Sequence, residues 1–137
     1  MNEISAGVVI FRENSKLLFL LLYYPSGHWD FVKGKIEENE NTLQTVTRET
    51  KEETGITDLN FVDGFEESIE YDFQYAGELI HKKVIFFLAK TSIEKIKISH
   101  EHLDYVWLEF EDALEKTTYQ NARSVLSRAN QLLVERL

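Results

Sequence analysis

The sequence predicts a mixed α/β fold, of the α/β or α+β class, in which helices cover both faces of a mixed β-sheet. Strand-like and helix-like patterns are mixed along the 137 residues, and many of the strand-like segments follow one another as in hairpins. The last segment carries an apolar stripe at helical spacing. Layers of this kind bury the apolar faces of sheet and helices together. We expect a single domain spanning residues 1–137, because the length suits one domain and no linker or internal repeat interrupts it.

Two strands are predicted at the N-terminus. Residues 4–11 form the first, residues 12–15 are a polar turn, and residues 16–24 form the second. The nearly continuous apolar run of the second strand indicates burial on both faces. Residues 25–27 end it by their turn chemistry, and residues 29–32 form a short extended segment.

A helix is predicted over residues 42–54. Asn41 is a suitable N-cap with Gln44 three residues later, as in a capping box, and Gly55 is suited to the position after the helix. The residues expected on its packing face are Leu43, Val46 and Thr50.

The second half of the chain predicts three more strands and a helical C-terminal region. Residues 60–75 and 78–90 form two long strands around a turn at residues 76 and 77, and residues 105–109 form another strand. From about Glu111 the pattern is helical. The apolar stripe of this region consists of Ala122, Val125, Leu126, Ala129, Leu132 and Leu133.

Composition narrows the function classes. The chain has no cysteine, which excludes disulfides and thiolate metal sites, and its longest apolar run is too short to span a bilayer. It shows no secretory signal, so we expect a cytoplasmic protein without a membrane partner. A net charge of −9 argues against a general nucleic-acid binder. A polyphosphate ligand would also be repelled unless divalent cations and placed lysines screen it.

An acidic cluster lies on the predicted helix. Glu49, Glu52 and Glu53 share one face at helical spacing. Carboxylates this close repel one another unless a cation joins them, and hard divalent cations such as Mg²⁺ take oxygen ligands. A solvated acidic helix face is the alternative interpretation.

The spacing around this cluster resembles the Nudix box. Thr50 departs from it, because that position is usually aliphatic. The resemblance implies the Nudix fold, an α/β/α sandwich with a mixed sheet. The matching residues are Gly34, Glu40, Arg48, Glu49, Glu52, Glu53, Gly55 and Ile56.

Segments outside the box resemble the asymmetric diadenosine tetraphosphate hydrolases (bis(5′-nucleosyl)-tetraphosphatases) of the animal and archaeal type. The resemblance implies hydrolysis of a phosphoanhydride by water, with Mg²⁺ or Mn²⁺ as cofactor and with ATP and AMP as products. Val32 departs from the proline that most relatives have, and Asn39 replaces a glycine-like residue in a turn that Asn tolerates. The similar segments are residues 28–35, 82–89, 99–102, 105–108, 111–113 and 123–126.

The resemblance also implies roles for the acidic residues. Glu49, Glu52 and Glu53 would be metal ligands, and Glu101 would be a further ligand or the general base. Arg48 would complete the catalytic group by orienting a metal-binding glutamate through a bidentate pair. Which glutamate is the general base stays open. The alternative interpretation of Arg48 is an ordinary arginine on the helix surface. The alternative interpretation of Glu101 is a residue of a polar loop without a catalytic role. Of the remaining box residues, Gly34 and Gly55 would be structural, and Glu40 would support the loop.

Substrate contacts are expected from lysines and aromatic rings. Lys33, Lys35 and Lys82 are candidate phosphate ligands, with His28 as a possible addition. Adenine needs a stacking surface. Tyrosines in strands are more often core residues. The candidates for stacking are Tyr71, Tyr75 and Tyr119, of which Tyr71 and Tyr75 are preferred.

Other functions share these motifs. A Nudix pyrophosphohydrolase acting on other nucleoside polyphosphates or on capped RNA 5′ ends would have the same box. A Nudix sensor that binds a nucleotide without cleaving it would be expected to lose box glutamates, and all are present here. We expect a dinucleoside polyphosphate as the partner, no nucleic acid other than capped RNA ends, and a monomer or weak dimer.

Overall fold

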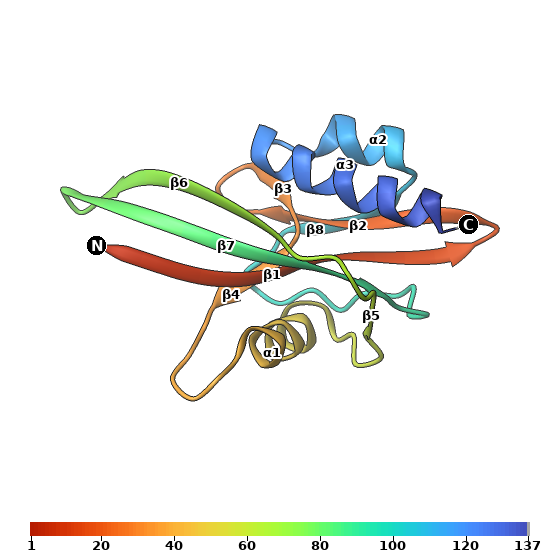
Figure 1. Cartoon of the computed structure of the whole chain (residues 1–137), viewed down its shortest axis with the longest axis horizontal. Coiled ribbons are helices and arrows are strands. Elements are labelled where there is room, and N and C mark those ends of the chain that lie inside the picture. Colours follow the sequence, from red (N-terminus) through yellow and green to blue (C-terminus); the bar gives the residue numbers. More distant parts are fainter. Residues whose placement is uncertain (137) are drawn as a thin grey trace.

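The computed structural model describes residues 1–136, which form eight strands and three helices (Figure 1). The strands make one mixed sheet, with α1 against one face and α2 and α3 over the other (Figure 1). The predicted mixed α/β/α sandwich is confirmed, and Leu137 lies outside the described residues. The elements are β1 (Asn2–Asn14), β2 (Lys16–Tyr24), β3 (His28–Asp30), β4 (Val32–Lys35), α1 (Thr42–Thr54), β5 (Asn60–Phe61), β6 (Glu67–Tyr75), β7 (Glu78–Lys90), β8 (Asp104–Leu108), α2 (Phe110–Lys116) and α3 (Gln120–Glu135).

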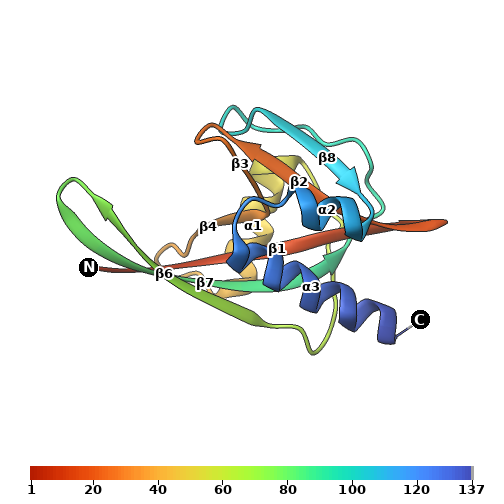
Figure 2. The same cartoon turned by 90° about the horizontal axis from the view of Figure 1, so that it is seen from above.

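Strand β1 organises the sheet. It pairs antiparallel with β2 and β4 along one edge and parallel with β7 along the other. Strand β8 adds to β2, and β6 adds to β7. Strands β6 and β7 continue as a long hairpin beyond the helices (Figure 2). Pairing with β1 places β4 beside α1, where the acidic cluster lies.

The first strand is longer than predicted. β1 continues to Asn14 instead of ending at residue 11, so the predicted four-residue turn is wrong. Arg12 is buried, with its guanidinium carbon 5.1 Å from the centroid of the Trp107 ring. Because its guanidinium packs on the Trp107 ring, Arg12 can stay inside the sheet. The turn between β1 and β2 is therefore only Ser15, which has a φ of 58°.

Two predicted segments are divided in the structure. Residues 60–75 form β5 and β6 instead of one strand, because Gly64 turns the chain between them with a φ of 87°. Residues 29–32 are divided at Phe31 between β3 and β4. Strand β1 begins two residues earlier than predicted, and the other predicted strand boundaries lie within one residue of those observed.

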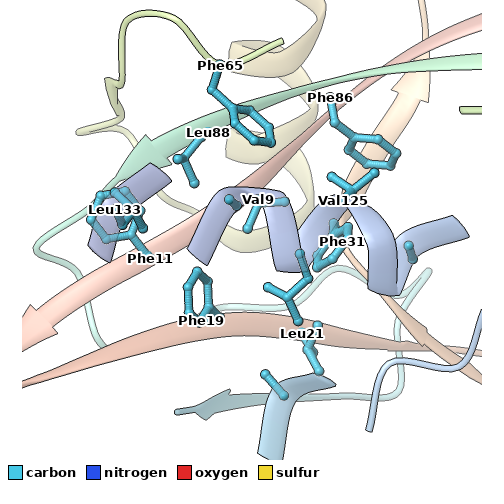
Figure 3. Packing of buried hydrophobic residues seen from close by; sticks show 14 of the residues in the cluster. Val9, Phe11, Phe19, Leu21, Phe31, Phe65, Phe86, Leu88, Val125 and Leu133 are labelled. Carbon is cyan, nitrogen blue, oxygen red and sulfur yellow. The ribbon is translucent and has the colours of Figure 1, made fainter. Parts of the chain in front are cut away.

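The core has one layer on each face of the sheet. Residues 8–11 of β1 and 19–22 of β2 are all buried, and alternate residues join the layer under α3 or the layer under α1. This confirms that the second strand is buried on both faces. Figure 3 shows the layer under α3, where Phe31 and Phe86 lie close to Val125.

Helix α1 has the predicted bounds and the predicted capping box. The Asn41 side chain accepts a hydrogen bond from the Gln44 backbone N–H at 2.8 Å, and the Gln44 side chain accepts one from the Asn41 N–H at 2.9 Å. Gly55 follows the helix in the left-handed conformation, with a φ of 79°. Its N–H bonds to the Lys51 carbonyl at 3.0 Å, which satisfies a terminal carbonyl of the helix.

The packing face of α1 differs from the prediction at one residue. Val46 and Thr50 are fully buried, but Leu43 is 44% exposed. Thr45 is buried in the first turns instead. Glu53 is buried on the same helix, so the packing face includes one member of the acidic cluster.

Helix α3 carries the predicted apolar stripe. Its buried residues are Ala122, Val125, Leu126, Ala129 and Leu133, with Leu132 partly buried against the same core. Among residues 1–136, no helix has the length and apolarity needed to cross a membrane. The cytoplasmic location stays a prediction.

Candidate active site

Gly34 allows β4 and α1 to approach closely. In the sheet it lies opposite Ala6 of β1. A Cβ atom at Gly34 would overlap the Glu49 carboxylate, so a larger residue would displace this side chain. Only 15% of the Glu49 side chain is exposed, and its carboxylate is therefore confined between the helix and the sheet.

Arg48 organises several acidic side chains around it. Its Nε and Nη2 atoms donate to the two carboxylate oxygens of Glu40 at 2.6 and 3.0 Å. Its Nη1 atom donates to Glu49 at 2.8 Å and lies 3.4 Å from Glu52. The Lys35 carbonyl accepts a further bond at 3.2 Å. One guanidinium thus joins α1, β4 and the intervening loop.

The bidentate partner of Arg48 is Glu40, whereas the resemblance implied a metal-binding glutamate. Glu40 also accepts hydrogen bonds from the Glu37 N–H at 3.1 Å and the Thr45 hydroxyl at 2.9 Å. The hydrogen bond from Arg48 is the largest cause that lowers the pKa of Glu40 to about 2. Asn39, with a φ of 65°, makes the left-handed turn that brings Glu40 to this position.

Glu53 is the buried member of the acidic cluster. Its side chain is 3% exposed, and within residues 1–136 neither carboxylate oxygen has a hydrogen-bond partner. The His102 Nε2 atom lies 3.2 Å from Oε1 but is not aligned for a hydrogen bond. Burial and the adjacent Glu49, followed by the charges of Glu101 and Glu52, raise the pKa of Glu53.

This donor set fits a divalent cation. Magnesium and manganese take carboxylate oxygens, and a cation beside Glu53 would supply the partner that its buried oxygens lack. In the described part of the chain, no three His, Asp or Glu side chains already converge as a formed metal site. Glu49 and Glu52 bond Arg48 instead, so a cation would have to compete with this guanidinium for their oxygens.

The loop that carries Glu101 is attached to the end of α1. The Ser99 N–H bonds to the Glu53 carbonyl at 3.2 Å, and the Lys97 N–H bonds to the Thr54 carbonyl at 3.0 Å. These bonds satisfy carbonyls that the end of a helix leaves free. The loop thereby brings the exposed Glu101 close enough for its charge to act on Glu53.

A row of aromatic rings leads away from Glu53. The Tyr24 ring packs edge-on against His102 at 4.5 Å and stacks on His28 at 4.7 Å with an interplanar angle of 4°. His28 in turn lies 5.2 Å from the ring of Tyr119. Sequence reasoning missed Tyr24, because it ends an apolar strand and looks like a core residue.

A cavity of about 510 Å³ lies at the other end of this row, at the start of α3. Its walls combine apolar and aromatic side chains with a few polar groups, as in many ligand sites. The lining residues from the sheet and from the start of the α3 segment include Tyr71, Tyr119, Ile69, His28, Asp30 and Lys33.

Asp30 fixes Lys33 at the cavity. Asp30 is 3% exposed, its Oδ1 atom accepts the Phe31 N–H at 2.7 Å, and its Oδ2 atom lies 3.0 Å from the Lys33 Nζ. Burial opposes the charge of Lys33, but Asp30 together with Tyr71 and Tyr119 more than offsets it, so the pKa of Lys33 is raised. Sequence reasoning missed Asp30, because nothing in its local pattern indicated an ion pair with Lys33.

The other predicted lysines lie beside Lys33. Lys82 is the register partner of Tyr71, and burial, Lys33 and Lys35 lower the pKa of Lys82. Lys35 forms an ion pair with Glu3 at 2.9 Å. Burial is the largest cause of the lowered pKa of Lys82 and the repulsion between lysines adds to it, so an anionic ligand at this group of lysines would relieve repulsion.

The tyrosines expected to stack on adenine fall in different places. Tyr71 and Tyr119 both line the cavity. Tyr75 is not among the lining residues and is 61% exposed near the end of the β6–β7 hairpin. Tyr119 was considered but not preferred, and its place depends on how α3 docks on the sheet.

Comparison with known proteins identifies the family. The NUDIX domain matches residues 1–129. The chain is 34% identical over 142 residues to the asymmetrical bis(5′-nucleosyl)-tetraphosphatase of Mus musculus, covering 94% of each chain. It is 30% identical over 137 residues to a dihydroneopterin triphosphate diphosphatase of Haemophilus influenzae, covering 93% of this chain and 87% of the relative.

A solved structure agrees in fold. The C. elegans Ap4A hydrolase binary complex superimposes with a TM-score of 0.82 at 31% identity, covering 97% of this chain and 98% of the other. Nudix hydrolases generally use divalent cations, which suits the unpartnered carboxylate of Glu53. The box on α1, the fold and the match across nearly the whole length together show that this chain belongs to the Nudix hydrolase family.

Proposed function

We propose that the protein hydrolyses diadenosine tetraphosphate to ATP and AMP, with Mg²⁺ or Mn²⁺ as cofactor and water as the attacking group. The observation that carries this proposal is the cavity between Tyr71 and Tyr119, with Lys33 beside it and the acidic cluster beyond Tyr24. In this arrangement the cavity would take a base, Lys33 would bind phosphates and the acidic cluster would bind cations. The mouse and C. elegans relatives, which carry names for this activity, support the choice of substrate.

Glu53, Glu52 and Glu49 would hold the cation, with Glu101 as a further ligand or as the general base. When bound, the cation would screen the phosphate charge and lower the pKa of a coordinated water. Glu53 is buried and unpartnered among the described residues, so it is the member that gains most from a cation. Arg48 keeps Glu49 and Glu52 on the same side of α1 as Glu53.

The cavity would hold one adenosine and the adjoining phosphates. Adenine would stack on Tyr71 and Tyr119, since stacking depends on an exposed ring face. Lys33 and Lys82 would bind phosphate oxygens, with His28 in the cavity wall and Lys35 beside the two lysines. Because the net charge is −9, these lysines are needed to offset repulsion of a polyphosphate.

The dihydroneopterin triphosphate relative favours a second candidate, hydrolysis of a triphosphate attached to a single ring system. If the cavity takes a single ring system, this reaction would also be compatible with the site. A noncatalytic sensor is disfavoured because all the box glutamates are present.

A substrate panel tests the proposal. Purified protein with Mg²⁺ is incubated separately with diadenosine tetraphosphate, nucleoside triphosphates, dihydroneopterin triphosphate and capped RNA, and products are separated by chromatography. We expect ATP and AMP from diadenosine tetraphosphate, with the highest kcat/KM of the panel. A higher kcat/KM for another compound would replace the proposed substrate.

A further inference from the structure

His102 lies between the Glu101 loop and the buried Glu53 carboxylate. Its side chain is 1% exposed, and its Nε2 atom is 3.2 Å from Glu53 Oε1. Its other ring nitrogen, Nδ1, is 3.3 Å from the Ser99 hydroxyl. The Tyr24 ring packs against it edge-on at 4.5 Å. The imidazole is thus held on three sides, with Nε2 facing the carboxylate.

Hydrogen bonds around Ser99 indicate where the imidazole proton lies. The Ser99 hydroxyl oxygen accepts the Glu101 N–H at 3.2 Å. We infer that the hydroxyl donates its one proton to His102 Nδ1, because this ring nitrogen is the acceptor within hydrogen-bond distance of it in residues 1–136. A neutral imidazole that accepts at Nδ1 carries its proton on Nε2. That proton would lie on the ring nitrogen that is 3.2 Å from Glu53 Oε1, which is within hydrogen-bond distance although the two groups are not aligned in this structure.

The same segment is connected to α1 through its backbone. The Ser99 N–H bonds to the Glu53 carbonyl, so Ser99 contacts the main chain of Glu53 while His102 reaches its side chain. The His102 N–H in turn bonds to the Ser99 carbonyl at 3.1 Å, which closes a tight turn around Glu101. Glu53, His102 and Glu101 are therefore placed by one connected set of contacts.

We propose that His102 is a positioning residue that donates its Nε2 proton to Glu53 and holds this carboxylate, together with the Glu101 loop, in the arrangement that binds a divalent cation. Carboxylates that bind cations are themselves usually hydrogen-bonded, and loss of such a partner lowers cation affinity about 10–100-fold. This inference rests on one part of the proposed function, the binding of a divalent cation. It does not depend on which substrate is hydrolysed.

Calorimetric titration of the metal-free protein with Mn²⁺ tests this role without relying on turnover. We expect His102→Ala to weaken Mn²⁺ affinity about 10–100-fold. His100→Ala is the matched control, because His100 is an exposed histidine in the same loop, and it should bind Mn²⁺ like the wild type. Unchanged affinity in His102→Ala would overturn the proposal.

Two conservative variants separate positioning from space filling. In His102→Gln the amide nitrogen can reach the Nε2 position, whereas in His102→Asn it reaches only the Nδ1 position near Ser99. We expect the Gln variant to recover most of the Mn²⁺ affinity and the Asn variant to lose about 10–100-fold. Equal affinities in these two variants would contradict the proposal, and the pair decides the question even if His102→Ala does not fold.

Measurements on the wild type distinguish this inference from the proposed substrate. If the Mn²⁺ affinities of the variants follow the expected order but the wild type does not cleave diadenosine tetraphosphate, the role of His102 stands and the substrate proposal fails. If cleavage occurs but all variants bind Mn²⁺ equally, the substrate proposal stands and the role of His102 fails. Absence of Mn²⁺ binding in the wild type would overturn the role of His102.

Discussion

On the α1 face of the sheet the functional side chains are carboxylates, whereas on the α3 face they are lysines and tyrosine rings. The carboxylates are held in place before any ligand binds, because Arg48 bonds Glu40, Glu49 and Glu52. Lys33 is held by a single carboxylate, that of Asp30. The acidic side is thus organised by a network and the basic side by isolated pairs.

This difference bears on how an acidic protein can bind an anion. With a net charge of −9, the lysines would be neutralised if they lay among the box glutamates. The sheet separates the two groups, and the stacked rings of Tyr24 and His28 lie where they meet. A polyphosphate bound at the lysines would still have to approach the carboxylates, which is where a cation is needed.

The largest effect is expected on the acidic side. Glu53→Gln should lower kcat about 10³-fold, because several kcal/mol of cation-dependent stabilisation are lost. Metal-free stability should be equal to or higher than that of the wild type, since a buried carboxylate without a partner is replaced by a neutral amide.

Steady-state kinetics and thermal unfolding of the metal-free protein check this prediction. Glu66→Gln, which changes an exposed glutamate away from α1, is the control. A Glu53→Gln enzyme with the wild-type kcat would remove the acidic side from the reaction.

An intermediate effect is expected in the cavity. Tyr119→Ala should raise KM for diadenosine tetraphosphate about tenfold or more, because one stacked base contributes roughly 1–3 kcal/mol. Tyr119→Phe keeps the ring face and should resemble the wild type. Tyr75→Ala should change KM little, since Tyr75 lies outside the cavity. Equal increases in KM for Tyr75→Ala and Tyr119→Ala would show that the base does not bind where the cavity lies.

A similar or smaller effect is expected for the basic side. Lys33→Met should raise KM about tenfold, because a hydrogen bond to a charged group contributes roughly 1.5–3 kcal/mol and Lys82 remains nearby. Lys95→Met, at an exposed lysine, is the control. Kinetics at low and high salt would refine the comparison, because the loss should shrink as salt screens the lysines. A KM unchanged at low salt would argue against phosphate binding at Lys33.

The smallest effect concerns stability in acid. The pKa of Glu40 is about 2 in the fold and 4.5 ordinarily. A lowered pKa means that the Glu40 carboxylate stabilises the fold above about pH 4.5, and this contribution is lost as the pH falls from about 4.5 to about 2. In urea unfolding, the free energy of the wild type should fall more steeply over this range than that of Glu40→Gln. If the free energies of unfolding of the two proteins changed in parallel with pH, the Arg48–Glu40 pair would not contribute to the stability of the fold.

The sequence predicted much of this arrangement where the signal was local. Helix α1 has the predicted ends because capping depends on neighbouring residues such as Asn41 and Gln44. The carboxylate cluster follows from helical spacing alone. The two-sided burial of β2 follows from its unbroken apolar run.

What the sequence did not predict depends on contacts between distant segments. The Arg48–Glu40 fork requires the loop turn at Asn39, and the length of β1 requires Trp107 beside Arg12. Tyr119 reaches the cavity only because α3 docks on the sheet near His28. Contacts between residues this far apart in the sequence cannot be predicted from the pattern of neighbouring residues.

The dependence of hydrolysis on divalent cations tests the central claim most directly. Metal-free protein is mixed with diadenosine tetraphosphate, products are measured with a chelator present, and Mg²⁺ is then added in excess. The proposed chemistry predicts no products before Mg²⁺ is added, and equal amounts of ATP and AMP afterwards. Products formed at the same rate in the chelator, or two molecules of ADP in place of ATP and AMP, would contradict it.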